Sequence, residues 1–204
     1  MRLVFIAIAL VLGACNANSN ASGDIGAACV DAGTSLPCER CAVSDTEELA
    51  VMAAALDAVL EADIGTDRSI AVRAITSYYE KDFSKTVDET TDADAATRDD
   101  CKNKNYGGKQ YCIEGDLATR VKYRYVDEAT YRQILKDITA IEHDGSRPDP
   151  VAVLSRVGFN ADKTEAIAYA EYTCGSLCGD GALYLLRKSG NAWTVYKILG
   201  QWIS

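Results

Sequence analysis

Cysteine is the residue type through which this chain of 204 residues could do chemistry, because it has eight cysteines and a single histidine. Cys38 and Cys41 form a C-x-x-C motif, which thiol oxidoreductases place at a helix N-terminus to lower the pKa of one thiol. Here the predicted helix begins a few residues after Cys41, and no thioredoxin-like strand precedes the motif. We therefore expect a structural disulfide among Cys29, Cys38 and Cys41, with redox exchange at Cys38 and Cys41 as the alternative. A zinc site at these thiols would need a fourth ligand.

Four further cysteines predict two local disulfides. Cys174 and Cys178 flank a glycine-containing turn between two predicted strands, and closing this small loop would contribute about 2 kcal/mol. Cys101 and Cys112 bracket a polar, glycine-rich loop with few apolar residues to order it, and closing that loop would contribute about 3 kcal/mol. Both pairs are expected to stabilise the fold.

The remaining composition excludes several classes of function. A formal charge of −9 argues against non-specific binding to nucleic acids, which depends on lysine and arginine. His143 is predicted to lie in a loop beside Asp144, so neither a Ser-His-Asp triad nor a multi-histidine metal site is expected. The acidic run 88–100 lacks the glycine continuation of an EF-hand calcium loop. We predict no cofactor and no metal, and an envelope-polymer hydrolase that uses carboxylates stays a further alternative without nominated residues.

The first 15 residues predict export from the cell. Arg2 precedes the apolar run 3–12, the order of a secretory signal peptide, and this run is shorter than the ~20 residues of a membrane-spanning helix. The segment Leu12-Gly13-Ala14-Cys15 resembles a bacterial lipobox. The resemblance implies cleavage before Cys15 and acylation of that residue. It also implies a place at the outer membrane, facing the periplasm, because Asn16 stands where an aspartate would retain the protein at the inner membrane. An ordinary signal peptide followed by a chance cysteine is the alternative.

The chain after the signal peptide (residues 1–14) is expected to consist of a tether and one domain. Residues 15–43 begin with small polar residues without periodicity, which predicts a lipid-anchored flexible tether. Residues 44–204 are long enough for one hydrophobic core and show no internal repeat, which predicts a single domain. Acylation of Cys15 leaves seven of the eight cysteines, and an odd number places at least one thiol outside intramolecular disulfides.

Hydrophobic periodicity predicts a helix followed by strands. Ser44 fits an N-cap with Glu47 three residues later, and an apolar helical stripe follows as far as Leu60. Further strands are predicted at 69–79, 117–126, 151–159, 165–174, 182–188 and 193–203, and further helices at 94–102 and 127–138. This order predicts an α+β fold in which the N-terminal helix packs on a mainly antiparallel sheet that ends in a C-terminal β-meander.

Three segments of the C-terminal part resemble a recurrent group of uncharacterised bacterial secreted proteins. The segments are Arg156-Val157-Gly158-Phe159-Asn160, Cys174-Gly175-Ser176-Leu177-Cys178-Gly179 and Gln201-Trp202-Ile203-Ser204. The resemblance covers most of residues 44–204 and implies a shared α+β fold. It implies no activity, because the group has none to carry over.

A row of basic residues is the remaining candidate binding site. Arg120, Lys122 and Arg124 alternate along a predicted strand and therefore share one face. Such a row could bind an anionic polymer or an acidic partner, and cross-strand pairing with residues such as Glu171 is the alternative. Together with the lipobox, these patterns predict a lipid-anchored, non-enzymatic binding module of the cell envelope. Its expected contacts are the membrane and an envelope protein or glycan, with no nucleic acid.

Overall fold

The computed structural model describes residues 30–31, 34–35, 42–61, 69–77, 81–106, 110–140, 149–175 and 177–204. The predicted signal peptide, the predicted lipobox with Cys15 and most of the expected tether lie outside these ranges, and so do Cys29, Cys38 and Cys41. His143 also lies outside them.

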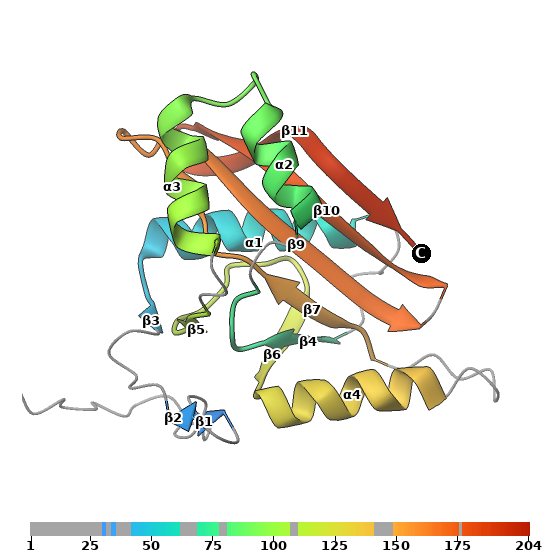
Figure 1. Ribbon diagram of the computed structural model, residues 1–204. Coiled ribbons are helices and arrows are strands. Elements are labelled where there is room, and N and C mark those ends of the chain that lie inside the picture. Colours follow the sequence, from blue (N-terminus) through green and yellow to red (C-terminus); the bar gives the residue numbers. More distant parts are fainter. Residues whose placement is uncertain are drawn as a thin grey trace, which may run out of the picture.

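The described residues form an α+β fold, as predicted (Figure 1). The helices are α1 (Thr46–Leu60), α2 (Lys81–Glu89), α3 (Ala95–Asn105) and α4 (Glu128–Ala140). The strands of the main sheet are β4 (Ser69–Arg73), β6 (Lys122–Val126), β7 (Val151–Leu154), β8 (Gly158–Phe159), β9 (Glu165–Gly175), β10 (Cys178–Ser189) and β11 (Ala192–Ile203). Two short pairs complete the described strands: β1 (Val30–Asp31) with β2 (Thr34–Ser35), and β3 (Ala42–Val43) with β5 (Cys112–Ile113).

The main sheet has the strand order β11-β10-β9-β7-β4-β6, with β8 also paired to β9. The pairs β7–β9, β9–β10 and β10–β11 are antiparallel, so the predicted C-terminal β-meander is confirmed. β4 pairs in parallel with both β6 and β7. The sheet therefore has two edges, with β6 at one side and β11 at the other (Figure 1).

Helices cover both faces of this sheet. α1 packs on one face through an apolar stripe that includes Met52 and Leu56, and this contact forms the largest apolar cluster. α2 and α3 cover β9 and β10 on the opposite face, through Val87 and Cys101. α4 covers β4 and β7 through Ile138. β4 lies between β6 and β7 and has a helix on each face, so Ile70, Ala71 and Val72 are all buried.

α1 begins at an N-cap that differs from the predicted one. Asp45 Oδ1 accepts hydrogen bonds from the backbone N–H groups of Glu47 (2.9 Å) and Glu48 (3.1 Å). The predicted cap at Ser44 is therefore wrong, although serine and aspartate suit an N-cap equally well. Glu47 does not complete a capping box, because its carboxylate accepts hydrogen bonds from Lys188 and Trp193 on the meander.

The other predicted elements are present with altered boundaries. The helices predicted at 94–102 and 127–138 are confirmed as α3 and α4, and α2 lies where no helix or strand was predicted. The strand predicted at 69–79 ends at Arg73, and the strand predicted at 117–126 begins at Lys122. The strand predicted at 151–159 divides into β7 and β8, because Arg156 and Val157 turn toward α1.

Candidate functional site

The turn between β9 and β10 is closed by a disulfide between Cys174 and Cys178, whose Cα atoms lie 5.2 Å apart. The first of the two predicted local disulfides is therefore confirmed. Leu177 lies inside this ring and is 89% exposed. The carbonyl oxygen of Gly179, next to the ring, accepts a hydrogen bond from the backbone N–H of Ser204 (3.1 Å). The segments 174–179 and 201–204 thus lie side by side.

The second predicted disulfide, between Cys101 and Cys112, is wrong. Both residues are buried, and they form no disulfide with each other. Cys101 lies on α3 and packs with Ile167 on the sheet face that α2 and α3 cover. Cys112 lies on β5, where it pairs with Ala42 of β3. The two cysteines thus belong to different elements of the fold, α3 and β5, although they are only 11 residues apart in the sequence.

The structure divides the predicted basic row. Lys122 and Arg124 lie on β6, where both are exposed and neither forms an ion pair with the described residues. Arg120 precedes β6 and binds two carboxylates at 3.4 Å, Asp57 of α1 and Glu61 at the C-cap of this helix. These two carboxylates raise the pKa of Arg120, and Asp57 contributes most. Only two of the three basic residues thus remain available to a partner.

Trp202 covers β10 near the C-terminus. Its Nε1 donates a hydrogen bond to Tyr169 Oη (2.8 Å), and the Tyr169 hydroxyl in turn donates to the Glu171 carboxylate. The indole occupies the space that a side chain at Gly181 would need, so glycine is required there. Glu171 lies on β9, which β7 and β4 separate from β6, and its suggested cross-strand pairing with the basic row is therefore wrong.

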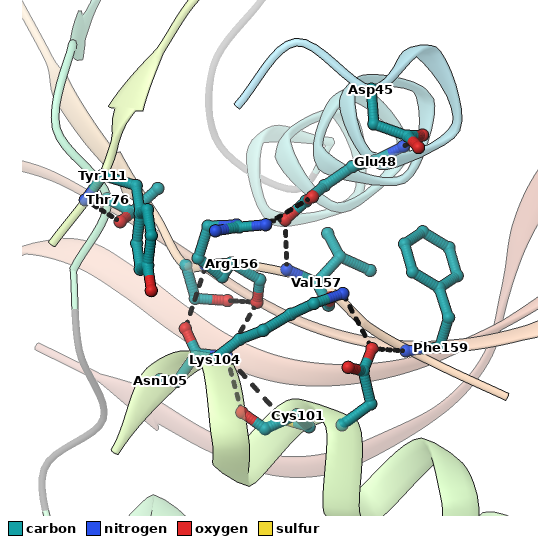
Figure 2. Close-up of polar contacts among 12 residues, drawn as sticks. Asp45, Glu48, Thr76, Cys101, Lys104, Asn105, Tyr111, Arg156, Val157 and Phe159 are labelled. Atoms are coloured by element: carbon teal, nitrogen blue, oxygen red, sulfur yellow. Dashed lines mark hydrogen bonds and ion pairs between the residues drawn. The ribbon is translucent and has the colours of Figure 1, made fainter. Parts of the chain in front are cut away.

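A buried polar cluster holds the segment between β7 and β8 against α1 (Figure 2). The Glu48 carboxylate accepts hydrogen bonds from Arg156 Nε (2.6 Å) and Nη2 (3.0 Å), and from the backbone N–H of Val157 (2.9 Å). The side chains of Arg156 and Glu48 are only 15% and 4% exposed. The Tyr111 ring covers the guanidinium, with its centroid 4.3 Å from the central carbon. Such a bidentate pair fixes α1 relative to the sheet.

α3 binds the same segment from the other side (Figure 2). Asn105 exchanges two hydrogen bonds with the backbone of Arg156, one to its carbonyl oxygen and one from its N–H, both 3.0 Å long. Asp100 accepts a hydrogen bond from the backbone N–H of Phe159 (2.8 Å). A Cβ at Gly158 would overlap the backbone of Cys101, so β8 and α3 touch directly. The segment 156–160 therefore connects α1, α3 and the main sheet.

β11 carries an exposed apolar surface that was not predicted as a site. Its large exposed residues are Val195 (38%), Tyr196 (55%), Ile198 (46%) and Ile203 (74%). Among the described strands, β11 pairs only with β10. We call these four residues and the β11 backbone the β11 edge. The sequence held a signal for it, because adjacent apolar residues at 195–196 and 198–199 interrupt the alternation of a strand.

The two edges of the sheet differ in charge. β6 is five residues long and exposes Lys122 and Arg124, whereas β11 is 12 residues long and has Lys197 as its single charged residue. Lys197 Nζ lies 2.6 Å from Asp92 Oδ2, so this charge is already paired. Charged side chains on an edge strand oppose pairing with another chain. The β11 edge lacks this protection, and it is the candidate functional site.

Three carboxyl groups with shifted pKa values are held in the charged form. Hydrogen bonds lower the pKa of Asp45, chiefly from Lys163, and that of Glu47, chiefly from Lys188. A backbone N–H lowers the pKa of Asp127. The general acid of a hydrolase has a raised pKa, so none of these three residues fits that role. Within the ranges described, no group of three or more histidine, cysteine, aspartate or glutamate side chains is placed to hold a metal ion.

In the part of the chain that the structure covers, no helix has both the length and the apolar character needed to cross a membrane. No family model, no curated protein and no solved structure matches the chain.

Proposed function

We propose that the protein is a non-enzymatic binding module of the cell envelope, which binds a protein partner along the β11 edge. In this proposal a lipid on Cys15 holds the protein at the outer membrane, facing the periplasm. The observation that carries the binding function is the exposure of four large apolar residues, Val195, Tyr196, Ile198 and Ile203, on an edge strand whose single charge is paired. An open edge strand offers backbone N–H and C=O groups to an extended chain, and its side chains add specificity.

The side chains of the β11 edge suit a protein better than a glycan. They are apolar and aromatic, and aromatic residues are enriched in the cores of protein–protein interfaces. The Arg187 guanidinium carbon lies 3.6 Å from the centroid of the Tyr196 ring, which orders this ring before a partner arrives. A side chain that is already ordered loses less entropy on binding. Tyr196 is therefore the expected anchor of the contact.

The anchor at the membrane follows from the lipobox Leu12-Gly13-Ala14-Cys15. Each buried CH₂ of an acyl chain contributes ~0.8 kcal/mol, and attachment becomes stable when two or more chains are present. A protein held in this way meets membrane-bound partners at a high local concentration. A contact of modest area on β11 is then sufficient for specific binding.

Site-specific photo-crosslinking in cells that express the full-length chain tests the binding function. A photoreactive amino acid is placed at position 196 and, as a matched control, at position 177, because Leu177 is also exposed and apolar but lies outside β11. We expect discrete crosslinks from position 196 that disappear in an Ile198→Lys background, and none from position 177. A β11 edge that yields no crosslink would contradict the proposal.

Mass spectrometry of membrane-extracted protein, alkylated before and after reduction, tests the anchor separately. We expect an acylated Cys15 at the start of the mature chain, and its absence would overturn the proposed location. Alkylation of Cys38 or Cys41 in unreduced protein would favour thiol-disulfide exchange as the function instead.

A further inference from the structure

We infer that the partner of the β11 edge is a second copy of this chain, whose β11 pairs antiparallel with the first around a twofold axis at Ile198. The inference rests on the proposed function, because it names the partner of the same surface. It is carried by the internal symmetry of β11, by the charges near the strand and by the length of the strand.

The register between β10 and β11 shows which residues share a face. Every second residue of β10, from 180 to 188, points to the side of the sheet that α1 covers. The residues of β11 opposite these positions are Trp193, Val195, Ile198, Gln201 and Ile203. In sequence number, Val195 and Gln201 are each three from Ile198, and Trp193 and Ile203 are each five. The residues of β11 on this face are therefore arranged symmetrically about Ile198.

Two β-bulges produce this symmetry. In a regular strand, residues three apart point to opposite faces. The register of β11 with β10 shifts once on each side of Ile198, between its partners Leu183 and Tyr184 and between Leu185 and Leu186. Each shift adds one residue to β11 and so returns the side chains beyond it to the same face. One extra residue of β11 thus lies on each side of Ile198, Tyr196 before it and Leu199 after it, and this keeps the outer side chains of this face symmetric about Ile198.

Antiparallel pairing of two copies requires residues of the same face to lie opposite each other, because the twofold axis stands perpendicular to the sheet. With Ile198 on the axis, Ile198 lies opposite its own copy and Val195 lies opposite Gln201. Ile203, which is 74% exposed, lies opposite Trp193. The apolar residues of the β11 edge that lie on this face, Val195, Ile198 and Ile203, are then covered by the same strand face of the other copy.

The charges near β11 favour a second copy over a charged peptide. The chain has 30 acidic residues and none of them lies in β11, so two β11 strands approach without repulsion between carboxylates on the paired strands. A charged peptide would find no complementary charge on this strand, because Lys197 is bound to Asp92. An uncharged, apolar strand is the matching partner, and β11 itself has that character.

The length of β11 is sufficient for a stable contact. Antiparallel strands form about one backbone hydrogen bond per residue, so residues 193–203 of two copies would form about ten. A standard protein–protein interface carries about ten direct hydrogen bonds. Confinement of both copies to one membrane by their lipids raises their local concentration and favours the pair further.

The test uses the full-length, lipidated chain extracted in mild detergent, with two differently tagged copies expressed together. Light scattering after size exclusion measures the mass of the protein component, and capture of one tagged copy shows whether the other copy is bound to it.

We expect a dimer, and we expect Ile198→Lys to weaken dimerisation about tenfold or more, because it places two like charges opposite each other. Leu177→Lys is the matched control and should leave the dimer unchanged. Val195→Lys provides a second β11 variant, and circular dichroism confirms that each variant is folded.

The outcomes separate this inference from the function on which it rests. Crosslinks from position 196 to the differently tagged copy, lost in Ile198→Lys and kept in Leu177→Lys, support it. A wild-type monomer, or a dimer that persists in folded Ile198→Lys and Val195→Lys, overturns it. Crosslinks from position 196 to a different protein alone would overturn the second copy as partner and retain the binding function. No crosslinks from β11 would overturn both.

Discussion

Glu48 and Arg156 lie 108 residues apart in the sequence and form a bidentate ion pair that joins α1 to the segment between β7 and β8. Loss of one partner from a buried pair leaves an uncompensated charge and destabilises a protein by about 3–5 kcal/mol. We therefore expect Glu48→Ala to lower the free energy of unfolding by about that amount, as measured by urea denaturation. Glu61→Ala, which removes an exposed contact to Arg120, is the control and should lower it by less than about 1 kcal/mol. Equal losses in the two variants would contradict the assignment.

Asp45 links acid stability to the start of α1. Its pKa lies below the ordinary value of 3.8, chiefly because Lys163 binds the charged form. The unfolded chain therefore takes up this proton first as the pH falls, so the stabilisation is present above about pH 4 and is lost as the pH falls through the lower folded pKa. Asp45→Asn keeps the N-cap acceptor and removes the titration. We expect its urea midpoint to fall less between pH 5 and about pH 3 than that of the wild type, and parallel curves would contradict this.

The Cys174–Cys178 disulfide should stabilise the meander by a modest amount. A ring this small contributes about 2 kcal/mol in the chain-entropy model. We expect the double variant Cys174→Ser, Cys178→Ser to lose about that much free energy of unfolding under non-reducing conditions. In the wild type, the peptide that carries both cysteines should resist alkylation until a reductant is added. Alkylation without reductant would show that the bond does not form.

Gly158 is required where β8 touches α3. A Cβ at this position would overlap backbone atoms of Cys101, which cannot move aside as a flexible side chain can. Overpacking of this kind destabilises a protein by about 3 kcal/mol. Gly200→Ala is the matched control, because the nearest atom, Thr86 Cγ2, would lie at an ordinary 3.5 Å. Thermal unfolding should show a large loss for Gly158→Ala and a shift of a few degrees at most for Gly200→Ala.

The C-terminal meander was predictable because its information is local. Apolar residues alternate between short turns, and antiparallel neighbours in sequence become neighbours in the sheet. The parallel pairing of β4 with β6 and β7 depends on contacts between distant segments, which alternation within one strand does not contain. The choice of Asp45 over Ser44 as the N-cap was likewise not predictable, because both residue types serve equally well one position apart.

The candidate site was predictable only in part. Lys122 and Arg124 are exposed on a strand as expected, but the distant residues Asp57 and Glu61 bind Arg120. The β11 edge was not predicted, since exposure at an edge depends on the order of strands in the sheet. The adjacent apolar residues at 195–196 and 198–199 were visible in the sequence, and the structure shows them to be the signature of two bulges.

The difference between the two sheet edges also limits how far copies of the chain can assemble. If β11 of one copy paired with β6 of the next, the contact would repeat head to tail and produce an open fibre. β6 is too short to match β11, and it exposes Lys122 and Arg124 along the line of contact. In the proposed pairing, the sheet therefore grows at the β11 edge alone, and one added copy leaves no further β11 edge open. With the proposed lipid anchor, copies that are concentrated on a membrane surface can therefore associate without polymerising.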